Sequence, residues 1–292
     1  MHSSLDKKNM LKEHKKVAII GLGVVGGATY EDMMEILKKK ELGSYKLFGV
    51  DINKEVINKY LSKYQSSHFF GGMSTNIPQD MDIYIVSVYS PEQIEQVFAS
   101  IPKEKAVLIV IESTVPPELS KRLLKNKGNT KLTLFPHRFN PNDPEHRVFN
   151  LKRVLGGADK ESEKAALDFY KQFMNLEDIT IVSYFIAALS KPAENAYRFI
   201  EIAIAEDWKS ECARLGISFE ELRKSMNTKW NIDLKEARDG IGGTCLPKDS
   251  KFIKEFFSKS KLIKSAIEVD EEYKKKTPKR FLLTKFKIPK NH

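Results

Sequence analysis

One cysteine lies in a glycine-rich segment whose residue types could carry out nucleophilic chemistry. Cys245 follows the run Gly240–Thr244 and precedes Pro247, which suits the first turn of a helix. A helix N-terminus and the neighbouring Lys248 both favour the thiolate, the nucleophilic form of cysteine. Asp249 stands one turn further along, within reach of a bound water. The segment therefore predicts a reactive cysteine rather than a buried, inert one.

A long segment with helical character holds a second polar pair. Lys191 and Asn195 are four positions apart, so they share one helical face. Neighbouring alanine, tyrosine and phenylalanine residues would give them a partly apolar setting, in which an ammonium and an amide can polarise a substrate oxygen. Taken alone, the pair is more simply interpreted as solvated helix residues. Cys212, further along beside Trp208 and Leu215, is predicted to be buried and inert.

The N-terminal part carries a glycine pattern typical of dinucleotide binding. Glycines at three spaced positions follow a predicted strand and open a predicted helix, and Asp51 ends the next strand. In the dinucleotide-binding arrangement, such glycines allow a tight turn, close approach of a diphosphate and close helix packing, while the acid accepts from ribose hydroxyls. A carboxylate would repel a 2′-phosphate, which favours NAD over NADP; the alternative is an ordinary glycine turn. The predicted cofactor-binding residues here are Gly21, Gly23, Val24, Val25, Gly26 and Asp51.

Short apolar runs alternate with helix-like segments through the first part of the chain. The expected strands are Lys16–Ile20, Tyr45–Val50, Asp82–Val88, Ala106–Ile111, Lys131–Phe135, Arg153–Leu155 and Asp178–Val182. The expected helices are a stretch from the glycines to about Lys40, then Lys54–Lys63, Pro91–Ala99, Pro117–Lys125 and Glu161–Met174. Buried strands that alternate with helices predict an α/β fold, in which a Rossmann-like, doubly wound parallel sheet is covered on both faces.

The second part of the chain is predicted to be helical. Phe185–Leu215 forms one long segment, in which Pro192 should either kink or start the helix. Further helices are expected at Ser218–Met226 and Ser250–Val269. The predicted organisation is an NAD-binding Rossmann-like domain at 1–183, a helical central and catalytic domain at 184–272, and a basic tail at 273–292.

The apolar residues of the long segment cover more than one helical face. A helix that is apolar on several faces is normally buried on several sides. We therefore expect it to pair two copies of the chain in a homodimer. The residues are Phe185, Leu189, Phe199, Ile200, Ile202, Ala203, Ile204 and Trp208.

Composition excludes several classes of protein. The chain has 292 residues, is 41% hydrophobic and has two cysteines, so it can form a core but no disulfide framework. No apolar run approaches the ~18 residues of a membrane span, and the polar start is no secretory signal; a cytoplasmic location is expected. The net charge is +10, but the tail holds eight basic residues and no acid. A solvated tail is therefore favoured over a nucleic-acid or membrane-surface partner.

Histidine spacing gives no indication of a metal site. His137 and His146 lack any recognised ligand spacing, and the other histidines are terminal or isolated. We predict no metal.

Four segments together resemble the UDP-glucose/GDP-mannose dehydrogenase family. They are GLGVVG with a following VDIN, ESTVPPE, SKPAENAYRFIEIAIAE, and GIGGTCLPKD. The segment Phe135–Gly157 is similar to the variant in dehydrogenases of UDP-N-acetyl-hexosamines. The similarity extends from about Val17 to Glu272, and the family's C-terminal nucleotide-binding domain is expected to be absent from this chain.

The resemblance implies oxidation of the C6 alcohol of a nucleotide-sugar, such as a UDP-sugar, to a carboxylate by two NAD+ in succession, as in polysaccharide biosynthesis. Cys245 would capture the aldehyde and then carry a thioester that water hydrolyses. Lys191 and Asn195 would stabilise the developing oxyanion, while Asp249 and Thr114 would hold or activate water.

The resemblance also assigns roles to three further residues and a second role to Thr114. Ser90 stands where the family usually has a threonine near the cofactor, and Thr114 and Lys248 are expected near the cofactor as well. His137 occupies the position at which the family usually has a catalytic glutamate; a histidine can also act as a base.

Two other functions remain compatible with the sequence. A hydroxyacid dehydrogenase acting on a smaller substrate would share the Lys-x-x-x-Asn helix without needing Cys245. An NAD-binding scaffold or interaction protein would need only the glycine loop.

Overall fold

The computed structural model describes residues 14–42, 44–143 and 145–276, which form two compact units. The units divide between Leu189 and Ser190, inside the long helix α6 (Tyr184–Leu215). The division falls within the helix because its first turn packs on the sheet of the first unit, where Tyr184, Ala187 and Ala188 are buried.

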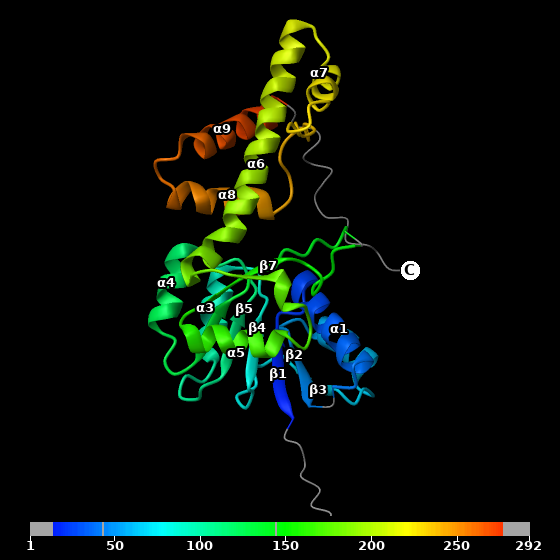
Figure 1. Cartoon of the computed structure of the whole chain (residues 1–292), viewed down its shortest axis with the longest axis vertical. Coiled ribbons are helices and arrows are strands. Elements are labelled where there is room, and N and C mark those ends of the chain that lie inside the picture. Colours follow the sequence, from blue (N-terminus) through cyan, green and yellow to red (C-terminus); the bar gives the residue numbers. More distant parts are fainter. Residues whose placement is uncertain (1–13, 43, 144, 277–292) are drawn as a thin grey trace, which may run out of the picture. The chain divides into compact units, whose positions relative to one another are not determined.

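The strands of the first unit form a single eight-stranded sheet in the described part of the chain (Figure 1). They are β1 (Lys15–Ile20), β2 (Tyr45–Val50), β3 (Phe70–Ser74), β4 (Ile83–Val86), β5 (Leu108–Ile111), β6 (Lys131–Leu134), β7 (Arg153–Gly157) and β8 (Ile179–Ile181). The remaining elements are α1 (Val24–Lys39), α2 (Lys54–Tyr64), α3 (Pro91–Ser100), α4 (Pro117–Lys125), α5 (Lys160–Tyr170) and the 3-10 turn η1 (Leu176–Asp178). The predicted Rossmann-like α/β fold is confirmed.

The strand order is β3-β2-β1-β4-β5-β6-β7-β8. Because β1 lies between β2 and β4, the connections run in opposite directions from it, and the loops after β1 and β4 meet at the carboxyl ends of the strands. The expectation of a wholly parallel sheet is wrong at one pair, since β6 and β7 are antiparallel. The described residues between those two strands, 135–143 and 145–152, contain no crossover helix, and only a parallel pair needs one.

The edge strand β3 was not among the predicted strands. Its sequence, FGGMS, contains two glycines and is half-buried throughout, so neither alternation nor an apolar run marks it. Its pairing with β2 also shifts register between Leu47 and Phe48. A glycine-rich edge strand of this kind forms because it pairs with the neighbouring strand β2, and its own residues give little indication of it.

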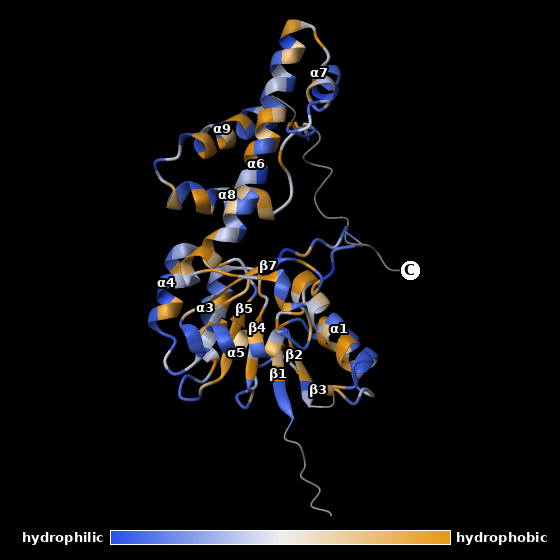
Figure 2. Ribbon diagram, viewed as in Figure 1, coloured by the Kyte–Doolittle hydropathy of each residue, from blue (hydrophilic) through white to orange (hydrophobic). Residues whose placement is uncertain are grey.

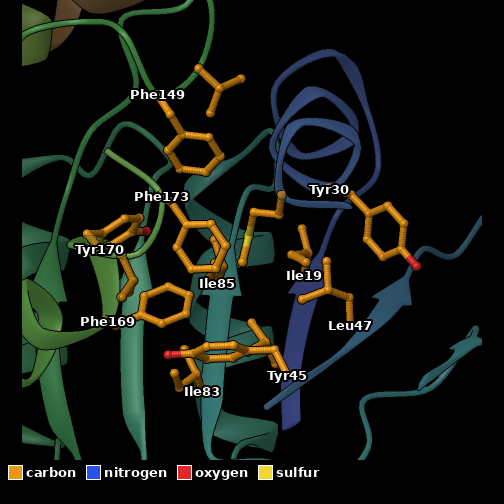
Figure 3. Packing of buried hydrophobic residues seen from close by; sticks show 14 of the residues in the cluster. Ile19, Tyr30, Tyr45, Leu47, Ile83, Ile85, Phe149, Phe169, Tyr170 and Phe173 are labelled. Carbon is orange, nitrogen blue, oxygen red and sulfur yellow. The ribbon is translucent and has the colours of Figure 1, made fainter. Parts of the chain in front are cut away.

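Two hydrophobic clusters cover the two faces of the sheet. Along β1, Val17 and Ile19 belong to one cluster and Ala18 and Ile20 to the other, as the period-2 alternation of a strand requires. On the first face, residues of α1, α2 and α5 pack on the strands, and Figure 3 shows the rings that gather there. On the second face, α3, α4 and the start of α6 do the same. Figure 2 shows the hydrophobic residues concentrated on the strands and the polar ones on the outer helix surfaces.

The second unit is helical, as predicted. After α6 it contains α7 (Phe219–Met226), α8 (Cys245–Phe256) and α9 (Lys261–Lys276). α6 continues through Pro192 rather than starting there. No helix in the described ranges has both the length and the apolar character required to cross a membrane.

The expectation of one helical stretch at Ser250–Val269 is wrong at both ends and in the middle. α8 already begins at Cys245, and the chain leaves the helix at Phe257 before α9 starts. The interruption contains two serines, at 258 and 260, whose side chains compete for backbone hydrogen bonds. α9 extends to Lys276, inside the predicted tail; residues 277–292 lie outside the described residues.

Candidate functional site

The glycine loop after β1 is fixed by close backbone packing. Gly21 has φ +87°, a left-handed conformation that favours glycine, and an added Cβ there would overlap the carbonyl oxygen of Ser87. At Gly26, an added Cβ would overlap the carbonyl oxygen of Gly21. At Gly23, by contrast, no atom lies within 4 Å of an added Cβ. Two glycines are therefore required by the fold, whereas the middle one faces open space.

The first turn of α1 is open to a ligand. The helix begins after Gly23 with no hydrogen bond from a capping side chain, and Val24, its first residue, is 65% exposed. The next residue, Val25, is half-buried. A helix N-terminus presents N–H groups and a partial positive charge, which together favour a phosphate.

Asp51 joins the end of β2 to this loop. Its Oδ2 accepts a hydrogen bond from the N–H of Leu22 at 2.8 Å, and its Oδ1 accepts one from the N–H of Asn53 at 2.8 Å. The residue remains half-exposed, and each carboxylate oxygen can accept a further bond. The carboxylate is thus held in place with capacity left for a ribose hydroxyl.

Two other predicted cofactor residues lie after neighbouring strands. Ser90 caps α3: its Oγ accepts from the N–H of Gln93 at 3.2 Å, and the Gln93 side chain accepts from the Ser90 N–H at 3.1 Å. This capping box gives Ser90 a structural role beside any contact with a cofactor. Thr114 follows β5 and is half-buried.

His137, predicted as a base, is buried after β6 and is 5% exposed. Its Nδ1 accepts a hydrogen bond from the N–H of Phe139 at 2.9 Å, so a neutral ring carries its proton on Nε2. Its backbone N–H donates to the carbonyl oxygen of Glu112 at 3.1 Å. Because Nδ1 already accepts this bond, Nε2 is the ring atom through which His137 would transfer a proton. The catalytic role of His137 stays a prediction.

A buried ion pair near these strand ends was missed by the sequence analysis. Nη2 of Arg153 on β7 lies 2.9 Å from Oε1 of Glu112, which follows β5, and neither side chain is exposed. Glu112 Oε2 also accepts from Thr29 on α1 and Ser87 after β4, each at 3.0 Å. The network therefore connects the ends of β4, β5 and β7 with α1. A buried charge without such partners would be costly.

In the second unit, Cys245 is the first residue of α8 and its side chain is exposed. The loop ahead of it is open: Gly243 has φ +77°, and added Cβ atoms at Gly242 and Gly243 would meet nothing within 4 Å. No capping side chain bonds the start of α8. Cys212 is buried, as predicted.

The predicted polar residues of α6 and α8 come together beside this cysteine helix. Asn195 Nδ2 donates to Asp249 Oδ2 at 2.6 Å, and both residues are buried. Lys248 Nζ lies 3.9 Å from Asp249 Oδ1. Burial raises the pKa of the Asp249 carboxyl, although the bond from Asn195 and the charges of Lys248 and Lys191 act in the opposite direction. The structure thus brings four of the predicted residues into one electrostatic cluster.

This arrangement can support two kinds of chemistry. An exposed thiol at a helix N-terminus favours nucleophilic attack, and a buried carboxyl with a raised pKa accepts a proton more readily than an ordinary aspartate. Among the described residues, no group of three or more His, Cys, Asp or Glu side chains is arranged to hold a metal ion.

Comparisons with known proteins give relatives for both units. The chain is 27% identical over 288 residues to UDP-N-acetyl-D-mannosamine dehydrogenase from Methanococcus maripaludis, covering 88% of this chain and 65% of that protein. The chain therefore spans about 65% of the length of this curated relative.

Solved structures show a similar fold. The chain superposes on UDP-N-acetyl-mannosamine dehydrogenase from S. aureus with a TM-score of 0.74 and 22% identity, covering 92% of this chain and 71% of that one. It also matches the UDP-D-ManNAc dehydrogenase of Pyrococcus horikoshii with a TM-score of 0.73 and 21% identity, covering 91% and 71%. Residues 186–272 match the model of the UDP-glucose/GDP-mannose dehydrogenase family, central domain. The resemblance predicted from the sequence is therefore confirmed as a similarity of this segment to the central domain of the UDP-glucose/GDP-mannose dehydrogenase family.

Proposed function

We propose that the chain is an NAD-dependent oxidoreductase that converts the C6 alcohol of a UDP-N-acetyl-hexosamine to a carboxylate. The match of residues 186–272 to the family's central domain supports this proposal. The names of the similar proteins, which are UDP-N-acetyl-mannosamine dehydrogenases, support the substrate class.

The observation that carries the proposal is the position of Cys245. It is exposed at the start of α8, one helical turn before the buried Asp249. Asp249 in turn bonds Asn195 and lies within the electrostatic influence of Lys191. A hydroxyacid dehydrogenase or a binding scaffold would not need an exposed thiol beside this cluster.

The residues of the glycine loop fit NAD. Gly23 leaves open space where a diphosphate would approach α1, and Asp51 is held with acceptor capacity for ribose hydroxyls. Its negative charge disfavours the 2′-phosphate of NADP. When bound, the nicotinamide supplies the acceptor for a hydride.

The proposed reaction oxidises the sugar twice. Loss of a hydride and a proton from the C6 alcohol gives an aldehyde. The Cys245 thiolate then forms a C–S bond to the aldehyde carbon, and the oxygen takes up a proton to give a thiohemiacetal. Loss of a second hydride and the hydroxyl proton leaves a thioester. Water adds to the thioester carbon, the C–S bond breaks, and carboxylate and thiol are released.

Three side chains of the second unit have proposed roles in these steps. Lys191 and Asn195 stabilise the oxygen that becomes negative during attack on the carbonyl carbon. Asp249 takes the proton of the attacking water, for which its raised pKa is suited.

A panel of sugars tests this function. The full chain is incubated with NAD+ and with UDP- and GDP-sugars, and NADH and acid are measured together. We expect two NADH for each molecule of acid, with a UDP-N-acetyl-hexosamine as the best substrate. Aldehyde accumulation with one NADH, a preference for a GDP-sugar, or oxidation of small hydroxyacids alone would contradict the proposal.

We also propose that the chain forms a homodimer through α6. The helix buries Phe199 and Ile202 but leaves Ile204 and Trp208 about 40% and 39% exposed. A helix with apolar side chains on its outer face is stabilised by a partner. Light scattering at micromolar concentration should give the mass of two chains, and Trp208→Glu should shift it toward one; a monomeric wild type would refute the dimer.

A cytoplasmic location is part of this proposal. Both cysteines are free thiols, which is the state that a reducing compartment maintains. The proposed nucleophile depends on that state.

A further inference from the structure

The cysteine loop is the segment 239–244, which leads to Cys245. Its first three residues, Asp239, Gly240 and Ile241, are hydrogen-bonded by side chains from two helices. The N–H of Gly240 donates to Oε1 of Glu206 on α6 at 2.7 Å, and the N–H of Ile241 donates to Oδ1 of Asp270 on α9 at 2.7 Å. Asp239 Oδ1 accepts from Lys209 on α6 at 2.6 Å and from Tyr273 on α9 at 2.9 Å. Each of the three residues is thus anchored.

The spacing of the anchoring residues explains why they converge. Glu206 and Lys209 are three positions apart on α6, and Asp270 and Tyr273 are three positions apart on α9. Residues at this spacing share one helical face. The two helices therefore present matching polar faces to the same short segment.

Burial makes these bonds important. Glu206 is fully buried and Asp270 is 4% exposed, and a buried carboxylate is costly unless it is hydrogen-bonded. One carboxylate oxygen of each acid accepts a hydrogen bond from a backbone N–H of the loop instead of from water. The folded loop and the two acids therefore stabilise one another.

The anchored segment also has an unusual backbone. Asp239 has φ 55° and Gly240 has φ 101°, so two successive residues adopt left-handed conformations, which a non-glycine residue seldom does. Such conformations persist where the surroundings hold them. Beyond the anchors, Gly242 and Gly243 are exposed and lead directly to Thr244 and Cys245.

We propose that Glu206 and Asp270 are positioning residues that hold the base of the loop and thereby set the geometry and reactivity of the Cys245 thiol. We call these two residues the carboxylate clamp. They act through the loop backbone. The inference rests on the proposed role of Cys245 as nucleophile, but thiol reactivity can be measured without turnover.

The charges around the clamp make its strength depend on protonation. Lys274 lies 2.5 Å from Asp270, and Lys209 and Tyr273 bond Asp239. Burial raises the pKa of Glu206 to about 7, and the nearby charge of Asp270 acts in the same direction. The bond from the Gly240 N–H and the charge of Lys274 oppose this shift. Glu206 therefore changes charge near neutral pH.

The test compares variants that remove the acceptor with variants that retain it. Glu206→Leu and Asp270→Ala remove the acceptor, whereas Glu206→Gln and Asp270→Asn keep a carbonyl oxygen. Asp207 on α6 and Glu268 on α9 are exposed acids close in sequence to the clamp residues. The variants Asp207→Asn and Glu268→Gln therefore serve as matched controls. In the full chain, iodoacetamide alkylation of Cys245 is followed by mass spectrometry, and exchange of the Gly240 and Ile241 amides is followed in parallel.

Loss of the acceptor should speed exchange of the corresponding amide by about tenfold or more, because a local hydrogen bond is lost. It should slow alkylation at neutral pH by about threefold or more, because a loosened loop frays the first turn of α8. The acceptor-retaining variants and both controls should stay within about twofold of wild type, a rescue that general destabilisation would not produce.

Two results would overturn the clamp. One is an alkylation rate in Glu206→Leu equal to that of the wild type while the protein remains folded by circular dichroism. The other is a Glu206→Gln variant as defective as Glu206→Leu. If the clamp holds but Cys245→Ser still produces acid, the proposed function fails and the clamp stands as a purely structural feature.

Discussion

The glycine loop of the first unit and the cysteine loop of the second are held in place by different means. At the glycine loop, Gly21 and Gly26 are required because any Cβ would overlap a backbone carbonyl. At the cysteine loop, Gly242 and Gly243 meet nothing, and the geometry comes from Glu206 and Asp270 instead. The glycine loop is held by the close packing of its own glycines together with one bond to Asp51, whereas the cysteine loop is held by two buried acids, 34 and 29 residues away in the sequence.

This difference determines what each loop can tolerate. A loop fixed by backbone packing is sensitive to an added methyl group at its own glycines. A loop held by buried acids is sensitive to replacement of those acids instead, and here also to the protonation of Glu206.

Replacement of the proposed nucleophile should give the largest loss. Cys245→Ser should reduce acid formation by about a thousandfold, because a serine hydroxyl is a far weaker nucleophile than a thiolate. Cys212→Ser, which changes the buried cysteine, should leave turnover nearly unchanged. NADH and acid assays on both variants check this; full acid production by Cys245→Ser would exclude the thioester route.

The glycine loop should show its steric requirement in a matched pair. Gly26→Ala should lower the free energy of unfolding by about 3 kcal/mol or more, since its methyl group would overlap backbone. Gly23→Ala should change that free energy by only about 1 kcal/mol or less, yet weaken NAD+ binding by about tenfold or more, because the methyl group projects toward the diphosphate. Urea unfolding and calorimetric titration distinguish the two. Equal destabilisation by both substitutions would contradict the steric account.

The acid that holds the cysteine loop should make the free energy of unfolding depend on pH. Glu206 has a folded pKa of about 7, against a usual value of 4.5, so the folded state holds a proton that the unfolded state has released between these values. Its contribution therefore makes the free energy of unfolding fall as pH rises through this window. Glu206→Gln should be more stable relative to wild type at about pH 8 than at about pH 5, by about 1–3 kcal/mol. Urea unfolding of both proteins at the two pH values tests the sign, and a constant difference would refute it.

The smallest expected effect concerns cofactor choice. Asp51→Ala should lower NAD+ affinity by about tenfold, because hydrogen bonds to a charged group contribute about 1.5–3 kcal/mol. NADP+ should lose less, since the repulsion of its 2′-phosphate disappears. The thermal shift that each cofactor produces measures this change in relative affinity. An unchanged preference for NAD+ would show that Asp51 does not contact the ribose hydroxyls.

The parts of the fold predicted correctly are those with local signals. β4 and β5 are apolar throughout, and β1, β2 and β6 are partly or mostly apolar. Their alternation with helices indicated a sheet covered on both faces. β3 has no such run, and the direction of β7 depends on what connects it to β6. The absence of a helical pattern between those two strands was the available signal for an antiparallel pair.

The site divides in the same way. The glycine spacing, Asp51, the Lys191 and Asn195 pair, and Cys245 ahead of Pro247 all stand in short motifs that can be read along the chain. The hydrogen bonds that Glu206 and Asp270 accept join residues 34 and 29 positions apart, so no local pattern reveals them. The available signal was an acid, Glu206, directly after the apolar run Ile202–Ala205 of α6, a position that requires a partner when buried.

The proposed reaction requires Cys245 to become covalently attached to the sugar during turnover. The full chain can be mixed with NAD+ and UDP-N-acetylmannosamine, quenched in acid, digested and analysed by mass spectrometry. The account predicts a peptide containing Cys245 whose mass is increased by the oxidised nucleotide-sugar, and no such peptide when NAD+ is omitted. Undiminished acid formation by protein in which Cys245 has been fully alkylated beforehand would contradict it.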